Sequence, residues 1–159
     1  MEKIEVLNID RSVTVAVTGH RTIKKKIDRE ELKEKFLYLI EKNYRVFLIG
    51  MAIGFDTLCF QILEEIRREK DIEIYACIPC VSQPDRFREE QKKEYFRMLD
   101  EADKKIYISK EYTPSCMQKR NMFMVNHASV LVAYYWQKTG GTANTVKYAM
   151  EQNISILYV

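Results

Sequence analysis

The chain has 159 residues, of which 47% are hydrophobic and 31% charged, and 26 basic against 23 acidic residues give a net charge of +3. This balance excludes a wholly disordered chain and can form one substantial core, so we predict a single domain over residues 1–159. The small charge argues against nucleic acid as a main partner, and no apolar run has membrane-spanning length. Four cysteines without a secretory signal indicate a cytoplasmic protein.

Strand-like and helix-like segments alternate along the chain. Continuous apolar runs predict buried strands at 13–17, 45–49, 72–78, 105–108, 130–135 and 154–159. Helical spacing of apolar residues predicts helices that begin near Asp28, Asp56 and Pro114, and others over 84–102 and 142–152. Such alternation is typical of right-handed crossovers between parallel strands. We therefore predict an α/β, Rossmann-like three-layer fold with a mostly parallel sheet of about six strands.

Turns that contain glycine follow three predicted strands, at 18–21, 50–54 and 140–142. In an open parallel sheet these turns share one rim, where ligands bind near the switch in strand order. Glycine lets the backbone approach an anion, and the first turn of a helix offers unpaired N–H groups. We predict a site for an anionic, nucleotide-like small molecule. Its predicted ligand-binding residues are Thr18, Gly19, His20, Arg21, Gly50, Met51, Gly54, Asp56, Arg120, Asn121, Gly140, Gly141, Thr142 and Thr145.

The same turns resemble those of a known family. The motifs are Thr18-Gly19-His20-Arg21, Gly50-Met51-Ala52 with Gly54 and Asp56, Cys116-Met117 with Arg120-Asn121 and Met124-Val125, and Gly140-Gly141-Thr142 with Thr145-Val146. They stand in the order found in the YpsA-like branch of the SLOG superfamily, which includes Smf/DprA and Lonely guy proteins. The resemblance implies a Rossmann-like fold and a nucleotide-derivative pocket at these turns.

Three functions stay open. The first is a sensor or carrier that binds a nucleotide or ADP-ribose-like ligand without a further cofactor, and we favour it. The second is an enzyme that hydrolyses a glycosidic or phosphate-ester bond of a nucleoside monophosphate. The residues 143–147 lack the glutamate that the phosphoribohydrolases carry after their glycines, which argues against this activity. The third is a DNA-associated module, and a homo-oligomer also stays open.

Several residues also have a structural explanation. Asp56, in the first turn of a predicted helix, has the position of a cap, which we favour over a catalytic role; as a ligand-binding residue it could accept a hydrogen bond from a ribose hydroxyl. His20 could bind a phosphate or brace its own loop, and we favour the phosphate. Cys77 and Cys80 have the CxxC spacing of redox and zinc sites, but their position at the end of a strand favours a structural role. The lysines at 24–26 are predicted to form a solvated loop.

Overall fold

The computed structural model describes residues 8–23 and 27–159. Its centre is one six-stranded sheet in the order β4-β3-β2-β1-β5-β6, in which every neighbouring pair is parallel. The strands are β1 (Thr14–Gly19), β2 (Val46–Ile49), β3 (Glu73–Ile78), β4 (Lys104–Tyr107), β5 (Val130–Tyr134) and β6 (Ser155–Tyr158). The predicted Rossmann-like sheet is confirmed.

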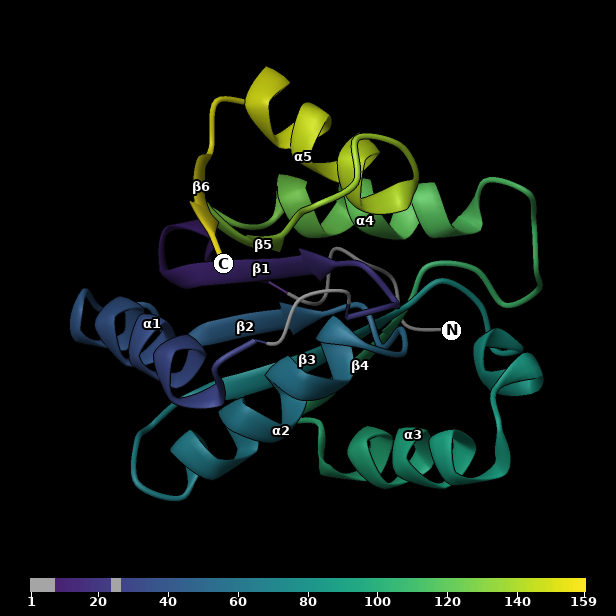
Figure 1. Cartoon of the computed structure of the whole chain (residues 1–159), viewed down its shortest axis with the longest axis horizontal. Helices are drawn as coiled ribbons and strands as arrows, with labels where there is room; N and C mark the ends of the chain where they lie inside the picture. The colour runs from purple at the N-terminus through teal and green to yellow at the C-terminus, as the bar shows by residue number, and fades with distance from the viewer. Residues whose placement is uncertain (1–7, 24–26) are drawn as a thin grey trace.

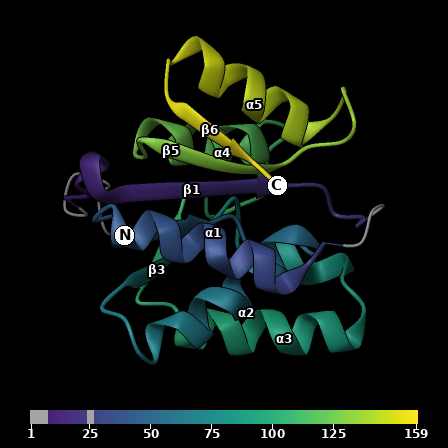
Figure 2. The same cartoon turned by 60° about the vertical axis from the view of Figure 1, so that its left-hand side comes forward.

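Helices cover both faces of this sheet, which gives three layers. The α-helices are α1 (Arg29–Glu41), α2 (Phe55–Arg67), α3 (Glu89–Glu101), α4 (Cys116–Asn126) and α5 (Gly141–Glu151), and the 3₁₀ turns are η2 (Arg11–Val13) and η3 (Gln83–Arg86). Figure 1 shows α1, α2 and α3 on one face and α4 and α5 on the other, and the turned view in Figure 2 agrees. No helix among the described residues is long and apolar enough to cross a membrane.

The central strands β1, β2 and β5 are apolar runs because they are buried between two helical layers, whereas the edge strands β4 and β6 are largely exposed or half-buried. On one face Phe36 of α1 packs edge-on against Phe47 of β2, with ring centroids 5.7 Å apart. On the other face Phe123 of α4 and Val146 of α5 belong to a second apolar cluster. Asp28 caps α1 as its sequence position predicts, since its carboxylate accepts hydrogen bonds from the N–H groups of the first turn.

The strand order places a switch point between β1 and β5. The chain moves outward from β1 through β2 and β3 to β4, and then returns to add β5 on the other side of β1. Gly19, the last residue of β1, pairs with Tyr134, the last residue of β5. The loops that leave β1, β2 and β5 therefore lie side by side, as the glycine turns predict.

One predicted helix is wrong in its extent. Residues 84–102 do not form a single helix, because Phe87 and Arg88 have extended backbone between η3 and α3. Two contacts account for the break. Phe87 turns its ring against Tyr95 at a centroid distance of 5.7 Å, and Gln83 donates from its side chain to the carbonyl of Gly50 at 3.0 Å. The other predicted elements differ from the structure by one or two residues at their ends.

Candidate functional site

A cavity of about 320 Å³ opens at the carboxyl ends of β1 and β2, beside the first turn of α5. We call it the switch-point pocket. Its walls come from the end of β1 and the loop after it, the β2–α2 loop, α4 and the first turn of α5. Ten of the fourteen predicted residues line it: Thr18, Gly19, His20, Arg21, Gly50, Asp56, Arg120, Asn121, Gly141 and Thr142.

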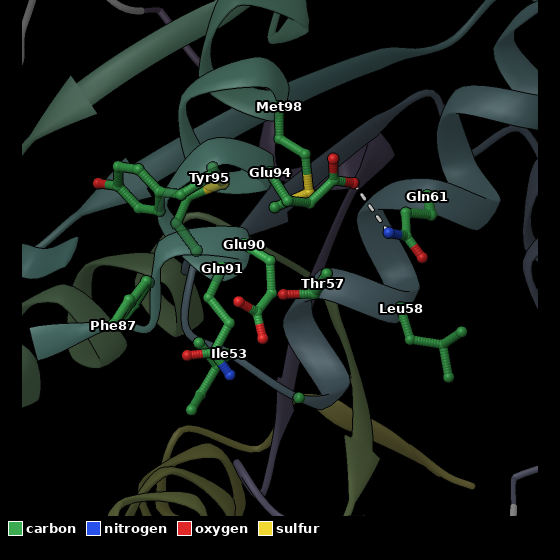
Figure 3. Close-up of a pocket in the computed structure, with 12 residues that line it drawn as sticks. Ile53, Thr57, Leu58, Gln61, Phe87, Glu90, Gln91, Glu94, Tyr95 and Met98 are labelled. Atoms are coloured by element: carbon green, nitrogen blue, oxygen red, sulfur yellow. Dashed lines mark hydrogen bonds between the residues drawn. The ribbon is translucent and has the colours of Figure 1, made fainter.

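The other four predicted residues lie next to the pocket. Met51 and Gly54 line a second cavity of about 330 Å³ between α2 and α3 (Figure 3). Gly140 precedes α5, and the Thr145 hydroxyl donates to the Gly141 carbonyl at 2.7 Å within the helix. The predicted lysine loop at 24–26 lies outside the described residues.

The N-terminus of α5 provides an open set of backbone donors. Gly140 occupies the N-cap position with φ of +98°, and it supplies no side-chain cap. The N–H groups of the first helical turn therefore have no partner within the helix. A Cβ added to Gly141 would meet only the amide nitrogen of Asn121, 4.0 Å away. The space in front of this turn can thus accept an anion.

Arg120 is the buried cation of the pocket, with 6% of its surface exposed. Its Nη1 donates to the carbonyl of Gly50, and its Nε donates to Asn121 Oδ1 at 2.7 Å. Burial lowers the pKa of Arg120, while the nearby carboxylate of Asp56 opposes that change. A guanidinium nevertheless stays charged in proteins, so α4 delivers a fixed positive charge to the exit of β2.

Asp56 is the buried anion of the pocket and is also 6% exposed. Its Oδ2 accepts from the N–H of Ala52 at 3.1 Å, so it braces the β2–α2 loop. The predicted role of Asp56 as a helix cap is wrong, because Gly54 holds the N-cap position of α2. Its Oδ1 is buried and has no hydrogen-bond partner within the described part of the chain. Burial raises the pKa of Asp56 to about 6, and Arg120, the Ala52 N–H and Arg21 act in the opposite direction. The free oxygen can accept a hydrogen bond from a ligand.

Glycine at position 50 is what allows these two charges to come together. A Cβ on Gly50 would lie 2.9 Å from Arg120 Nη1 and 3.1 Å from Asp56 Oδ2. The glycines at 19 and 54 have a packing role, and the close approach of their backbone to an anion stays a prediction. A Cβ on Gly19 would collide with the ring of Phe55, and one on Gly54 with the carbonyl of Arg21. Both glycines let the loop after β1 pack against the start of α2.

His20 lines the pocket and braces a neighbouring loop at the same time. Its Nε2 accepts from the backbone N–H of Gln137 at 3.1 Å, and its ring centroid lies 4.7 Å from that of Trp136. Burial lowers the pKa of His20, which favours the neutral ring that this acceptor role needs. The bracing contact is thus formed in the structure, whereas the preferred role in phosphate binding stays a prediction.

Four lining residues were not among the predicted ones: Val17, Ala52, Met117 and Met124. For the two methionines the sequence holds a signal. They lie three and four residues from Arg120 on α4, the spacing of side chains that share one helix face. Their face could have been assigned to the pocket once Arg120 was placed there.

The cysteines of the CxxC motif are buried in the interior. Cys77 lies within β3, and burial raises the pKa of its thiol to about 12. Cys80 is 1% exposed, and all four cysteines of the chain are free and buried. Reactive cysteines have lowered pKa values and partial exposure, so these thiols fit the structural role that we favoured.

The comparisons with known proteins agree with this architecture. A family model described as the YspA SLOG family, YpsA, matches residues 11–156. The chain is 32% identical to the uncharacterized SPbeta prophage-derived protein YoqJ of Bacillus subtilis (strain 168), over 75% of this chain and 80% of YoqJ.

Two solved structures share the fold. The first is DNA processing protein A (DprA) from Streptococcus pneumoniae, with a TM-score of 0.66 and 19% identity over 91% of this chain and 49% of DprA. The second is DNA processing protein A from Helicobacter pylori, with a TM-score of 0.67 and 13% identity over 98% of this chain and 68% of that protein. The chain thus spans about half the length of the pneumococcal protein.

The second of these structures corrects one prediction. It describes a single-stranded DNA binding mode for a protein with this fold, so the expectation that nucleic acid is not a main partner is wrong. The expectation came from the net charge of +3, which averages over the whole surface. The charges are unevenly distributed, because two arginines, Arg21 and Arg120, line the switch-point pocket against one carboxylate, that of Asp56. With a family model that spans most of its length, the chain belongs to the YpsA family of SLOG proteins.

Proposed function

We propose that the chain is a sensor or carrier that binds the phosphate and sugar of a nucleotide in the switch-point pocket. The observation that carries this proposal is the buried carboxylate of Asp56, whose Oδ1 lacks a partner among the described residues. An unsatisfied buried polar group costs about 1–3 kcal/mol. A ligand hydroxyl that donates to this oxygen would remove that cost, and the hydroxyl groups of a ribose are such donors.

The phosphate has a separate place in the proposal, in front of the first turn of α5. Backbone N–H groups point outward there, and the partial positive charge of a helix N-terminus stabilises an anion by about 0.3–1 kcal/mol. Arg120 adds a charged donor, because its Nη2 forms no hydrogen bond with a described residue. Arg21, which also lines the pocket, adds a second cation.

The size and composition of the pocket favour binding over hydrolysis. A volume of about 320 Å³ is at the small end of ligand sites and suits one nucleotide unit. Asp56 is the one carboxylate among its described lining residues. Glycoside hydrolysis normally uses two carboxylates, one as the acid and one as the base or nucleophile.

A second candidate function is binding of single-stranded DNA, and the fold match favours it. The Helicobacter pylori protein that shares the fold has a described single-stranded DNA binding mode. A strand offers the same phosphate and sugar groups as a free nucleotide. Single-strand sites also use aromatic side chains as stacking surfaces, and Trp136 and Tyr112 are 37% and 63% exposed.

Calorimetric titrations with adenosine, AMP, 2′-deoxy-AMP and ADP-ribose test the main proposal. We expect AMP to bind and adenosine to bind far more weakly, because the phosphate contacts are then missing. Asp56→Asn should weaken the binding of AMP more than the binding of inorganic phosphate, because only AMP carries the ribose hydroxyl groups. Equal affinity for adenosine and AMP, or no binding of any of the four, would refute the proposal.

A labelled oligothymidylate, titrated at two salt concentrations, tests the second candidate. Strand binding that weakens steeply with salt and is displaced by AMP would place the strand in the same pocket. Strand binding that AMP does not displace would give the chain a DNA-binding surface away from the pocket. Absence of strand binding would remove this candidate.

A further inference from the structure

We propose that Gln83 and Tyr95 are positioning residues of the switch-point pocket, which they hold in shape without lining it. The inference concerns the site of the proposed function. It also predicts a property of the ligand-free protein, so it can be tested even if the ligand proves to be different.

The two side chains form a chain of hydrogen bonds that ends at Gly50. Tyr95 of α3 donates from its hydroxyl to Gln83 Oε1 at 3.0 Å. Gln83 of η3 donates from its Nε2 to the Gly50 carbonyl at 3.0 Å. The same carbonyl also accepts from Arg120 Nη1. One backbone oxygen thus joins the buried arginine of the pocket to α3.

The Tyr95 hydroxyl sets which way the Gln83 amide faces. A glutamine side chain has a donor end and an acceptor end. With the hydroxyl donating to Oε1, the donor end must face the Gly50 carbonyl. The reversed amide would place its oxygen against that carbonyl, where two acceptors repel each other. Tyr95 is 3% exposed, so water does not readily replace this contact.

The turn that these bonds hold is strained. Met51, the residue after Gly50, is fully buried and has a φ of +65°. A non-glycine residue in this region costs about 1–3 kcal/mol and persists only where its surroundings fix it. Gln83 fixes the carbonyl directly before this residue, and Asp56 accepts from the N–H of Ala52 directly after it.

Tyr95 reaches this turn from outside the pocket. The β2–α2 loop separates two cavities, since Gly50 and Ala52 line the switch-point pocket while Met51 and Ile53 line the cavity between α2 and α3. Tyr95 belongs to the second cavity. In Figure 3 its ring extends from α3 to the side opposite the bond between Gln61 and Glu94. A hydroxyl outside the pocket therefore controls a carbonyl inside it.

Tyr95→Phe tests this link because it removes only the hydroxyl. Tyr75→Phe is the matched control. Tyr75 is 5% exposed, and its hydroxyl donates to Glu73 Oε2 at 2.6 Å near the opposite end of the sheet. Both variants lose one hydrogen bond from a buried tyrosine, so we expect similar small losses of thermal stability. Only Tyr95→Phe should change the position of Arg120 in the switch-point pocket.

The readout is the pH titration of the Asp56 carboxyl group in the ligand-free protein. The ¹³C NMR chemical shift of its carboxyl carbon reports the titration midpoint. The groups that act on Asp56 are Arg120 of α4, Arg21 of the β1–α1 loop and the Ala52 N–H, and all three lower its pKa. If Arg120 loses its fixed place, it lowers this pKa less. We therefore expect a higher titration midpoint in Tyr95→Phe and in Gln83→Met, and the wild-type midpoint in Tyr75→Phe.

Two further measurements separate positioning from a general loss of stability. In an Arg120→Met background, Tyr95→Phe should produce no additional change in the midpoint, because the group that it positions is gone. Affinity for AMP should fall about 3- to 10-fold in Tyr95→Phe and stay unchanged in Tyr75→Phe.

An Asp56 midpoint that is unchanged in Tyr95→Phe, or changed equally in Tyr75→Phe, would overturn the inference. Failure of AMP to bind the wild-type protein would refute the proposed function instead. The NMR titration needs no ligand, so it would still decide whether Tyr95 positions Arg120.

Discussion

Arg120 donates from Nη1 to the carbonyl oxygen of Gly50, a residue 70 positions earlier in the chain. This bond joins α4, on one face of the sheet, to the loop that leaves β2. Asp56 lies beside the same glycine, whose missing side chain leaves room for both charged groups. The central feature of the pocket thus depends on contacts between segments that are far apart in sequence.

Arg120→Met should abolish most of the affinity for AMP. The substitution keeps an unbranched apolar side chain in place of the aliphatic stem and removes the charged donors. Hydrogen bonds to charged groups contribute about 1.5–3 kcal/mol, so we expect a loss of about 10- to 100-fold in calorimetric titrations. Lys119→Met removes a charge from the adjacent, exposed position and should change the affinity little. Equal losses in both variants would mean that AMP responds to general charge and not to Arg120.

Asp56→Asn should change how stability depends on pH. Folding raises the pKa of Asp56 from its ordinary value of 3.8 to about 6, so the folded protein resists ionisation of this group. Its contribution to stability is therefore lost as pH rises from about 4 to about 6. The asparagine does not titrate. Relative to wild type, the variant should gain about 2 kcal/mol in free energy of unfolding between pH 4 and pH 7.

Urea denaturation at a series of pH values measures this difference. Asp100→Asn, at an exposed position on α3, serves as the control for the loss of one carboxylate. A constant difference between Asp56→Asn and wild type across this range would contradict the prediction. The same variant should bind AMP more weakly, so stability and binding would change in opposite directions.

Gly54→Ala should destabilise the protein more than Gly140→Ala. Both glycines have positive φ, at +83° and +98°, where a side chain costs about 1–3 kcal/mol. A Cβ at position 54 would also collide with the Arg21 carbonyl, whereas one at position 140 has no described atom within 4 Å. The difference in unfolding free energy between the two variants measures the energetic cost of that collision. Equal losses would show that the loop after β1 moves away without cost.

Gly141→Ala should leave the fold intact and weaken ligand binding. An added methyl group would meet only Asn121, 4.0 Å away, so the melting temperature should hold or rise slightly. The methyl group would occupy space in front of the first turn of α5, where the proposal places the phosphate. We expect weaker binding of both AMP and inorganic phosphate in calorimetric titrations. Unchanged affinity would move the phosphate away from this turn.

The cysteines should be unreactive in the native protein. All four are buried, and burial raises the pKa of Cys77 to about 12 and that of Cys59 as well. Dithionitrobenzoate should therefore release almost no thiolate colour at pH 8 until urea unfolds the chain, and then report four thiols. Rapid reaction of the native protein would revive the redox interpretation of the CxxC motif.

Most of the fold follows from local sequence patterns. A strand buried between two helical layers must be apolar throughout, so the runs at 45–49 and 130–135 identify β2 and β5 almost to the residue. The segment 84–102 shows where this reasoning fails. Helical periodicity continues through Phe87, but the break there depends on the bond from Gln83 to the distant Gly50 and on the contact of Phe87 with Tyr95.

The pocket was predictable to the extent that it is built from strand ends. Glycine turns after parallel strands converge by topology, and they contain seven of the ten predicted lining residues. The other three, Asp56, Arg120 and Asn121, were predicted from the helical segments that follow strands. The free Oδ1 of Asp56 and the bond from Tyr95 through Gln83 were not predictable, because both depend on how side chains pack in three dimensions. The net charge was misleading for nucleic acid because it does not report where the charges lie.

A ¹H–¹⁵N correlation spectrum recorded during titration with AMP tests the central proposal most directly. We expect saturable shifts of the backbone amides of Gly50, Gly141 and Thr142, and in Arg120→Met the same shifts only at about 10- to 100-fold higher AMP. Shifts confined to the cavity between α2 and α3, or a spectrum that AMP leaves unchanged, would contradict the assignment of the switch-point pocket as a nucleotide site.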